Sequence, residues 1–499
     1  MSASRPKTLW RQLFRLDPEG PLTIQAQLRA QLITAIGDAR MGPGTAVPSS
    51  RELAAALRVA RNTVVIVYQQ LADDGYLVAR ERRGYYVNPE VAARRATGGP
   101  VRPDAGPEAV DWPSRMRLQP SRQRNILKVA DWASYDYPFI YGQVDRELFP
   151  LADWRACCQQ VLSGAAALDW AQDLVTRDDP ELLEQIRDKV LPLRGVWASV
   201  DEIMVTTGAQ QALYLLADLL VGRTTTVGLE NPGYPDARNI FSLRTDRLRA
   251  LPVDAQGLVV GPALRGCRVV YATPSHQSPT TVTMPVSRRL ELLRRAGADD
   301  FIVIEDDYEH ETAFSALPNP ALKSLDRAGR VVYVGSLSKA LAPGLRLGYV
   351  VAPRPLIDEL RALRRLMIRH PAALIQRSFA RFLALGHYDS LNRRLVAVHR
   401  ERAAALAAAL ADLAPELRHP PVAGGSALWV EGPHWLDSRR LAEDVRREGV
   451  LIEPGDVHFH EEPLPLDRFR LGFASIPAGR IREGVRRLAG ALGRQRPRR

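Results

Sequence analysis

From residue 141 to its end, the chain alternates short apolar runs with amphipathic stretches of helical length. This alternation is typical of an α/β domain, in which helices cover a mainly parallel sheet. The region spans about 360 of the 499 residues, which is long enough for a large core and a smaller lobe. We therefore expect residues 136–499 to form one α/β domain with a small C-terminal α+β lobe.

Five of the apolar runs end in a polar or glycine-containing cluster. In open α/β sheets, ligands bind at the carboxyl ends of the strands, so the five clusters are expected to surround one site. The clusters occupy residues 207–211, 231–234, 273–277, 305–308 and 336–339.

One part of this expected site has the groups that bind a phosphate. Backbone N–H groups at a helix N-terminus, together with a nearby cation, favour bound phosphate. Such groups also occur at ordinary strand–helix junctions, so alone they indicate little. Here a glycine turn, two serine hydroxyls and an arginine supply them, namely Gly208, Ala209, Gln210, Ser336, Ser338 and Arg346.

The other polar residues suit the ring of pyridoxal 5′-phosphate, in which the cofactor acts as an electron sink. Asp306 can keep a pyridine nitrogen protonated, and Tyr308 can hydrogen-bond a ring phenolate. Lys339 can form a Schiff base where burial and nearby charge lower its pKa. Tyr234 can stack on the ring. Asp306 stands 33 residues before Lys339, and Arg346 stands seven after it, a combination that is hard to assemble by accident.

Residues 15–88 carry a different pattern, in which helices precede a basic hairpin. Apolar residues at every fourth position over 24–36 predict a first helix. Ser49 and Glu52 form a capping box that starts a second helix, and a third helix follows a short turn. Two strand-like triplets then flank the basic tip at 82–84.

This order is that of a winged helix-turn-helix, mostly α with a β-hairpin wing. The second helix of the turn presents short polar side chains to base edges, while arginines meet phosphates or the minor groove. The pattern alone also fits an ordinary three-helix bundle or a protein-docking module. The side chains expected to bind double-stranded DNA are Ser50, Arg51, Arg61, Asn62, Thr63, Tyr68, Arg82 and Arg83.

Charge alone does not locate the DNA-binding surface. The formal net charge is +12, but residues 480–499 hold eight arginines and a single acidic residue. There we expect a final helix with solvated arginines. Residues 89–135 are rich in proline, glycine and arginine and poor in large apolar residues, which predicts a flexible linker.

Other features indicate the cell compartment in which the protein works. The three cysteines lack the spacing of a disulfide framework or a metal site, which favours a reducing compartment. The N-terminus lacks the apolar core of a secretory signal, and no apolar run approaches the ~18 residues of a membrane span. We expect a cytoplasmic protein that binds no metal and contacts no membrane.

The motifs in the two regions resemble known families. Those similar to the DNA-binding domain of GntR-type regulators are at 48–53, 61–64, 68 and 75–77. Those similar to class I, fold type I aminotransferases are at 141–145, 148–150, 208–213, 231–235, 273–277, 305–308 and 336–339. Joined by a linker, they resemble a MocR/GabR-type transcriptional regulator over residues 20 to about 490.

The resemblance implies roles for single residues. Lys339 would bind pyridoxal phosphate covalently, Asp306 its pyridine nitrogen and Tyr308 its ring oxygen. Arg470, within 469–474, matches the arginine that holds the α-carboxylate of an effector or substrate by a bidentate fork. The resemblance also implies a homodimer, in which the linker is long enough for each DNA-binding head to cross to the partner.

Several positions depart from the family pattern. Arg58 replaces a frequent glycine, and Ala60 replaces the serine that usually caps the recognition helix. The stretch 173–180 lacks the tyrosine that usually reaches a cofactor phosphate across the dimer. A different sequence follows the His-Gln pair at 278–281, and Asp236 stands where some relatives have arginine.

The motifs favour a pyridoxal-phosphate-dependent, DNA-binding transcriptional regulator that senses an amino compound or the cofactor itself. A catalytically active aminotransferase with an accessory winged-helix domain requires the same pocket residues and remains the alternative. A cofactor-free regulator with a vestigial pocket is disfavoured, because Asp306, Tyr308, Lys339 and Arg346 are all present. The effector, the operator and the direction of regulation do not follow from the sequence.

Overall fold

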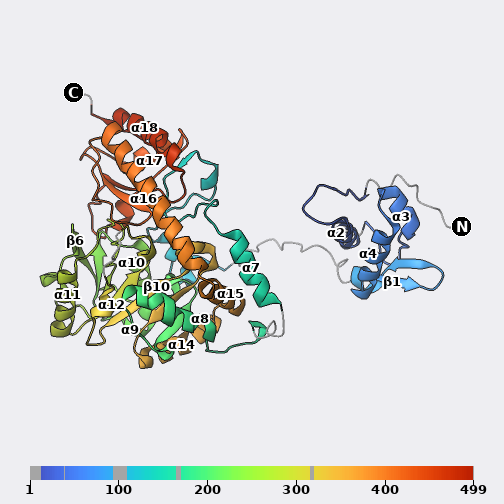
Figure 1. Cartoon of the computed structure of the whole chain (residues 1–499), viewed down its shortest axis with the longest axis horizontal. Coiled ribbons are helices and arrows are strands. Elements are labelled where there is room, and N and C mark those ends of the chain that lie inside the picture. The colour runs from blue at the N-terminus through green and yellow to red at the C-terminus, as the bar shows by residue number, and fades with distance from the viewer. Residues whose placement is uncertain are drawn as a thin grey trace. The chain divides into compact units, whose positions relative to one another are not determined.

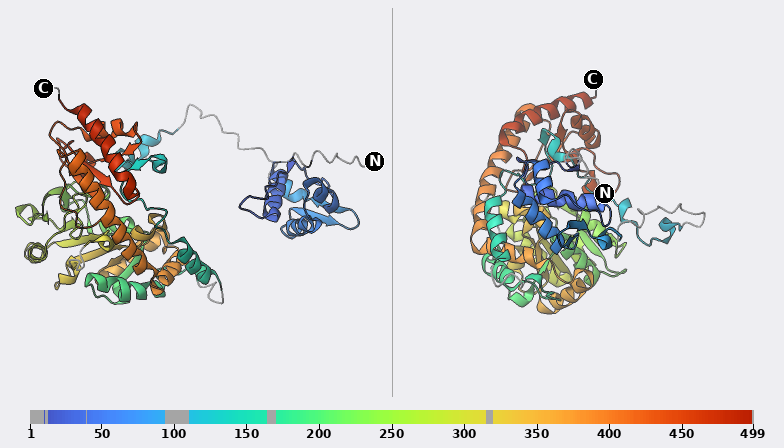
Figure 2. Two further views of the ribbon diagram at one scale, coloured as in Figure 1. Left: turned by 45° about the horizontal axis from the view of Figure 1, so that its top comes forward. Right: turned by 90° about the vertical axis from the view of Figure 1, so that its right-hand side faces the viewer.

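The computed structural model describes residues 10, 13–38, 40–93, 110–163, 170–314 and 320–497. The chain divides into two compact units, Met1–Arg115 and Met116–Arg499. Figures 1 and 2 show the ribbon of each unit from three directions. The first unit corresponds to the expected DNA-binding domain, and the second contains the expected α/β domain.

The first unit is a helical bundle with a hairpin, as the sequence predicts. One face of each main helix is apolar, and Leu28, Leu53 and Val64 are fully buried where these faces meet. Val87 of the hairpin packs on the same core. The elements are α2 (Ile24–Gly37), α3 (Ser50–Leu57), α4 (Arg61–Asp73), β1 (Leu77–Arg80), β2 (Gly84–Val87), α5 (Pro89–Ala93) and α6 (Trp112–Arg115).

Local backbone chemistry sets the ends of these helices. Ser49 and Glu52 form both hydrogen bonds of the capping box at the start of α3. Arg58 ends α3 with a φ of 57°, in the left-handed region that glycine favours. Ala60 precedes α4 without a side-chain cap hydrogen bond. Both residues therefore lower the stability of this unit compared with a glycine at position 58 and a serine at position 60.

Tyr68 does not face solvent. Its side chain is 1% exposed, and its hydroxyl donates to the carbonyl oxygen of Pro48 at 2.9 Å. Burial raises the pKa of this phenol far above its ordinary value. The prediction that Tyr68 contacts DNA is therefore wrong: the residue closes the core and joins α4 to the segment before α3.

The second unit contains an eight-stranded sheet. The strand order is β4-β11-β10-β9-β8-β5-β6-β7, in which β11 and β7 run antiparallel to their neighbours and the other pairings are parallel. The mainly parallel sheet is thus confirmed. Its strands are β4 (Ile203–Thr206), β5 (Val227–Asn231), β6 (Leu248–Asp254), β7 (Gly257–Leu258), β8 (Val269–Ala272), β9 (Ile302–Asp307), β10 (Val331–Ser336) and β11 (Gly348–Val351).

Helices cover both faces of this sheet, because neighbouring residues in each strand point to opposite sides and both sides are apolar. On one face Met204 packs in a cluster with α9, α10 and α14. On the other, Val205 packs with α8, α15 and α16, and Val303 packs with α11 and α12. These helices are α8 (Pro180–Gln185), α9 (Ala209–Leu220), α10 (Pro235–Ser242), α11 (Val286–Asp299), α12 (Leu322–Leu325), α14 (Arg354–Ile368), α15 (Ala373–Ala384) and α16 (His387–Leu413).

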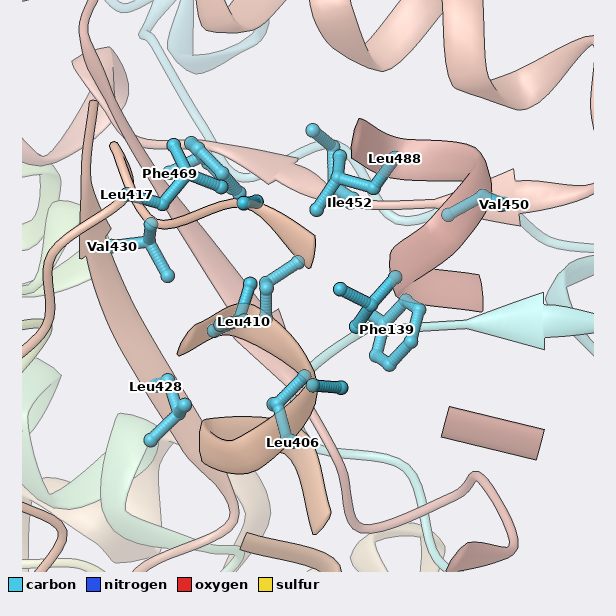
Figure 3. Packing of buried hydrophobic residues seen from close by; sticks show 14 of the residues in the cluster. Phe139, Leu406, Leu410, Leu417, Leu428, Val430, Val450, Ile452, Phe469 and Leu488 are labelled. Atoms are coloured by element: carbon cyan, nitrogen blue, oxygen red, sulfur yellow. The ribbon is translucent and has the colours of Figure 1, made fainter. Parts of the chain in front are cut away.

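A smaller α+β lobe completes the unit, as predicted. Its core joins Leu406 and Leu410 of α16 to Phe469 of the sheet, Leu488 of α18 and Phe139 (Figure 3). Its three-stranded sheet has the order β12-β15-β14, and β13 pairs with β3. The elements not yet given are β3 (Tyr137–Pro138), α7 (Leu151–Leu162), α13 (Ser338–Leu341), β12 (Ala427–Glu431), α17 (Ser438–Arg446), β13 (Val450–Leu451), β14 (Glu453–Pro454), β15 (Arg468–Gly472) and α18 (Ala478–Gln495). None of the helices in the described ranges is long and apolar enough to cross a membrane.

The arginines of α18 are not simply solvated. Arg482 pairs with Asp412 of α16, Arg494 pairs with Glu448, and Arg496 lies 2.8 Å from a carboxylate oxygen of Glu416. The acidic partners come from elements that pack beside α18, which a local count of charge cannot reveal. Much of the positive charge at this end of the chain is therefore balanced within the second unit.

Part of the expected linker, residues 116–135, lies within the second unit. The middle of the linker, 94–109, lies outside the described residues, but the second unit already begins at Met116. Gln123 donates to the carbonyl oxygen of Asn239 at 3.1 Å. Arg238 donates to the carbonyl oxygen of Arg124 and to those of Val457 and Phe459, each at 3.0 Å. Polar contacts with α10 thus hold 123–124, although this stretch lacks apolar periodicity.

Candidate functional site

A cavity of about 520 Å³ opens at the carboxyl ends of the central strands. Sites for small ligands commonly have volumes of about 300–1,000 Å³. All ten residues expected to hold the cofactor line this cavity, namely Gly208, Ala209, Gln210, Tyr234, Asp306, Tyr308, Ser336, Ser338, Lys339 and Arg346, and so does Arg470. Three further lining residues, Lys128, Tyr141 and Asp236, were not among the predicted site residues.

Lys339 is enclosed by aromatic rings. It follows β10 on α13, and its Nζ donates a hydrogen bond to the hydroxyl of Tyr141. The same nitrogen lies 4.0 Å from the centroid of the Tyr308 ring. Burial lowers the pKa of Lys339 to about 8, against the opposing effect of Glu309 and Asp306. A larger share of this amine is therefore neutral and nucleophilic at physiological pH than for an exposed lysine.

Asp306, near the end of β9, has one free acceptor. Its Oδ2 accepts a hydrogen bond from the Tyr271 hydroxyl at 2.8 Å. Its Oδ1 is buried and has no hydrogen-bond partner within the part of the chain that the structure describes. Burial raises the pKa of Asp306 to about 6. A buried acceptor of this kind needs a donor, and an N–H group of a ligand in the cavity can supply it.

The expected phosphate end is built on the turn between β4 and α9. Gly208 stands directly before α9 with a φ of 80°. A Cβ at this position would lie 2.9 Å from Nη2 of Arg346, so a larger residue would displace this guanidinium. Ser336 also lines this end, while the Ser338 hydroxyl donates to the carbonyl oxygen of Leu347 at 3.2 Å. The backbone N–H groups at the start of α9 and the charge of Arg346 together suit a phosphate.

Asp236 fixes the position of Tyr234 in the cavity wall. Its Oδ2 accepts hydrogen bonds from the Tyr234 hydroxyl at 3.0 Å and from Nε2 of Gln210 at 2.5 Å. The residue that replaces an arginine of some relatives thus fixes two other residues of the cavity wall. This side of the cavity therefore carries a carboxylate.

Arg470 reaches the cavity from β15 of the small lobe. Its Nε donates to Oε2 of Glu453 on the adjacent strand β14 at 2.9 Å, and its guanidinium lies 4.0 Å from the centroid of the Tyr141 ring. The side chain is 4% exposed, and its Nη2 has no hydrogen-bond partner among the described residues. This buried donor can bind an acid group of a ligand.

The stretch 173–180, which departs from the family pattern, has a structural role within its own chain. Asp178 is fully buried, accepts a hydrogen bond from Nη1 of Arg364 at 2.5 Å and accepts another from the backbone N–H of Val205 at 3.2 Å. Asp179 caps α8 by accepting from the backbone N–H of Leu182. These carboxylates hold α14 and α8 beside β4.

The remaining predicted DNA-binding residues lie on the surface of the first unit. Arg51 and Arg61 are exposed, and Nε of Arg61 donates to the Ser50 hydroxyl at 3.3 Å, which joins α3 to the start of α4. Asn62 is exposed and Thr63 is half-buried in the first turn of α4. Arg82 and Arg83 are exposed at the turn between β1 and β2.

Comparisons with known proteins agree with both units. Residues 131–488 match the family of class I and II aminotransferases, and residues 24–87 match the gntR family of bacterial regulatory proteins. The structure of LysN, an alpha-aminoadipate aminotransferase from Thermus thermophilus, covers 77% of this chain and 99% of its own, with a TM-score of 0.70 and 28% identity. That structure holds N-(5′-phosphopyridoxyl)-L-leucine.

Regulators match the chain over almost its whole length. The HTH-type transcriptional regulator TauR of Rhodobacter capsulatus is 42% identical, over 96% of this chain and 98% of its own. MocR of Rhizobium meliloti, a probable rhizopine catabolism regulatory protein, is 30% identical over 96% and 95%.

The fold and the site therefore define a helix-turn-helix regulator whose second unit is an aminotransferase domain of fold type I. Within that class, the chain belongs to the MocR-type transcriptional regulators. A second solved structure that the domain resembles, a kynurenine aminotransferase from Pyrococcus horikoshii with 26% identity and a TM-score of 0.70, is in complex with PMP and covers 79% of this chain and 99% of its own.

Proposed function

We propose that this regulator binds pyridoxal phosphate in the cavity of its second unit, binds operator DNA through its first unit and responds to an amino compound. The observation that carries the cofactor proposal is the unpartnered, buried Oδ1 of Asp306, which lies in one cavity with a lysine whose pKa is lowered to about 8. A protonated pyridine nitrogen satisfies this carboxylate, and the neutral amine suits an aldehyde.

The other residues of the cavity fit the same group. The N-terminus of α9 and Arg346 would hold the phosphate, Tyr308 the ring oxygen and Tyr234 the ring face. When bound, pyridoxal phosphate supplies an aldehyde that condenses reversibly with primary amines. Tyr141 would hold the Lys339 amine in place by accepting its hydrogen bond through the phenol oxygen. Arg470 would bind an acid group of the amino compound.

The sensor function, rather than turnover, is supported by the length of the match to regulators. TauR and MocR both include the DNA-binding unit and the aminotransferase domain within the aligned length. A ligand changes the balance between two protein states only if it binds one of them more tightly. The cavity lies between the large sheet and the small lobe. We propose that the ligand contacts both when they close around it, and therefore binds the closed state more tightly than the open one. A homodimer, with the two heads on one operator, is part of the same proposal.

Cofactor binding is tested by the visible absorbance of purified protein mixed with pyridoxal phosphate. We expect a lysine-bound spectrum in the wild type and its loss in Lys339→Ala and Lys339→Arg, of which the second keeps the positive charge. Asp306→Asn should retain the cofactor more weakly. Retention of the lysine-bound spectrum by both Lys339 variants would contradict the proposal.

DNA binding is tested by titrating the promoter region next to the protein's own gene, at fixed salt. Replacing Arg61 by alanine should weaken binding and lower the salt slope by about one. Arg40→Ala is the matched control, because Arg40 is exposed in the same unit and pairs with Asp38. Rapid turnover of an amino acid with a 2-oxo acid, without any effect of either on DNA affinity, would favour an enzyme instead.

A further inference from the structure

We infer that Lys128, in the segment 116–130 that begins the second unit and follows the linker (the joining segment), binds the acid group of the amine effector together with Arg470. This inference rests on the proposed function, since it concerns the same cavity. It names the effector class as primary amines that carry one acid group. It also makes Lys128 the residue through which ligand binding reaches the joining segment.

The position of Lys128 places its ammonium group in the cavity. The residue lines the cavity, and its Nζ would lie 3.1 Å from a Cβ added to Gly142. Gly142 follows Tyr141, whose hydroxyl contacts Lys339 and whose ring stacks on Arg470. Lys128 is thus beside the residue that touches both the cofactor lysine and the acid-binding arginine.

Lys128 has no partner of its own. Within the described ranges, no hydrogen bond or ion pair engages its ammonium group. Partial burial lowers its pKa, the carboxylates of Glu453 and Asp236 oppose this, and the positive charges of Arg470 and Arg346 lower it further. An anion bound between Lys128 and Arg470 would relieve this repulsion and supply the missing partner.

The charges of the cavity indicate how many acid groups it can balance. Lys339, Arg346 and Asp306 are committed to the cofactor in the proposed function. The charge of Arg470 is offset by Glu453, with which it forms a buried pair, and Asp236 is engaged by two neutral side chains. Lys128 is therefore the remaining positive charge among the described lining residues, and Asp236 is the remaining negative one. Lys128 and Arg470 are then the two cationic donors left for the ligand, which suits one acid group shared between them.

The segment that carries Lys128 is anchored just before it. Arg238 and Asn239 of α10 hold the carbonyl oxygen of Arg124, each at 3.0 Å. Lys128 thus follows a fixed point by four residues and enters the cavity from there. A ligand that binds Lys128 adds a second fixed point, and so restricts the stretch that leads back along the chain toward the DNA-binding unit.

The test compares β-alanine with propylamine, which share the amine and the three-carbon skeleton but differ in the acid group. Each is titrated into cofactor-loaded protein, and the absorbance of the bound cofactor reports binding. We expect the wild type to prefer β-alanine, and Lys128→Gln to reduce that preference roughly five- to tenfold, because a partly exposed charge-assisted hydrogen bond is lost. Propylamine should bind both proteins equally.

Two further variants test whether the change in preference comes from the charge of Lys128 or from a general disturbance of the segment. Lys128→Arg keeps the charge and should retain most of the preference, while Arg122→Gln, at an exposed arginine of the same segment, should leave it unchanged. Hydrogen exchange should show that β-alanine protects residues 120–130 in the wild type and not in Lys128→Gln. An unchanged preference in Lys128→Gln overturns the inference alone, whereas failure of the wild type to load the cofactor overturns the proposed function as well.

Discussion

Glu453 and Arg470 face each other on adjacent antiparallel strands, and the Nε of the arginine donates to the carboxylate at 2.9 Å. Both side chains are buried, with 7% and 4% of their surface exposed. Glu453 thus engages one edge of the guanidinium and leaves the Nη2 atom without a partner in the described structure. The arginine is held in place and partly neutralised before any ligand arrives.

Glu453→Gln should therefore destabilise the second unit by about 2–4 kcal/mol, because it leaves a buried arginine without its counter-charge. An anion that binds in the cavity should restore more stability to the variant than to the wild type. The measurement is denaturant unfolding with and without sulfate. Glu431→Gln, which removes the more exposed partner of Arg468, serves as the control and should cost less than about 1 kcal/mol.

The reaction of the cofactor-free protein with pyridoxal phosphate should depend on pH through Lys339. Burial lowers the pKa of this lysine to about 8, and only the neutral amine attacks an aldehyde. The rate should therefore rise as the pH increases toward 8 and level off above it. An exposed lysine analogue should keep accelerating to about pH 10.4. If the rate for the protein also keeps rising to that pH, the pKa of the Lys339 amine is not lowered.

Asp307 and Arg194 should stabilise the fold beneath the cavity. Burial alone would raise the pKa of Asp307, but Arg194, at 2.8 Å, outweighs it and holds this pKa well below the ordinary range. Because the pKa is lowered in the folded state, the stabilisation is present above pH ~4 and is lost as the pH falls. Asp307→Asn should cost about 3–5 kcal/mol at neutral pH and flatten the acid dependence.

The control for this prediction is Asp300→Asn. Asp300 pairs with Arg268 at 2.9 Å and with Arg330 at 3.1 Å, but its own side chain is 65% exposed. Such a pair contributes at most about 1 kcal/mol. The free energy of unfolding of both variants is measured with denaturant at pH 7. Equal losses would show that the buried pair stabilises the fold no more than the exposed one.

The DNA-binding unit should gain stability from two substitutions at helix ends. Arg58→Gly removes a side chain from a left-handed backbone conformation, and Ala60→Ser supplies the missing cap of α4. Each should add about 1 kcal/mol when made alone. Thermal unfolding of the full chain, followed by a probe in the first unit, provides the measurement. Ala55→Ser, at an exposed position inside α3, should bring no such gain.

The sequence is sufficient to predict most of the cavity, because its residues follow strands that are recognisable from local apolar runs. Asp306 and Lys339 were found in this way, since parallel strands bring their carboxyl ends together. Glu453 was missed, because its pairing with Arg470 depends on the register of two strands, which local pattern does not determine. Lys128 was missed because contacts of α10, over one hundred residues away, fix the segment that carries it.

Tyr68 is the opposite case, a residue that was predicted to be functional but is structural. Its spacing from Val64 and Leu71 on α4 places it on the buried face, and the structure confirms that position. A tyrosine in a family motif suggested a DNA contact that the burial of its ring excludes. Helical spacing was the better guide here, because it reports directly on the side of the helix that packs.

Arg238 joins three parts of the chain with one guanidinium group, since it donates to carbonyl oxygens at 124, 457 and 459. Bonds that share a donor side chain break together when that side chain leaves. Release of the joining segment from α10 should therefore be an all-or-none local opening that also frees the loop of the small lobe.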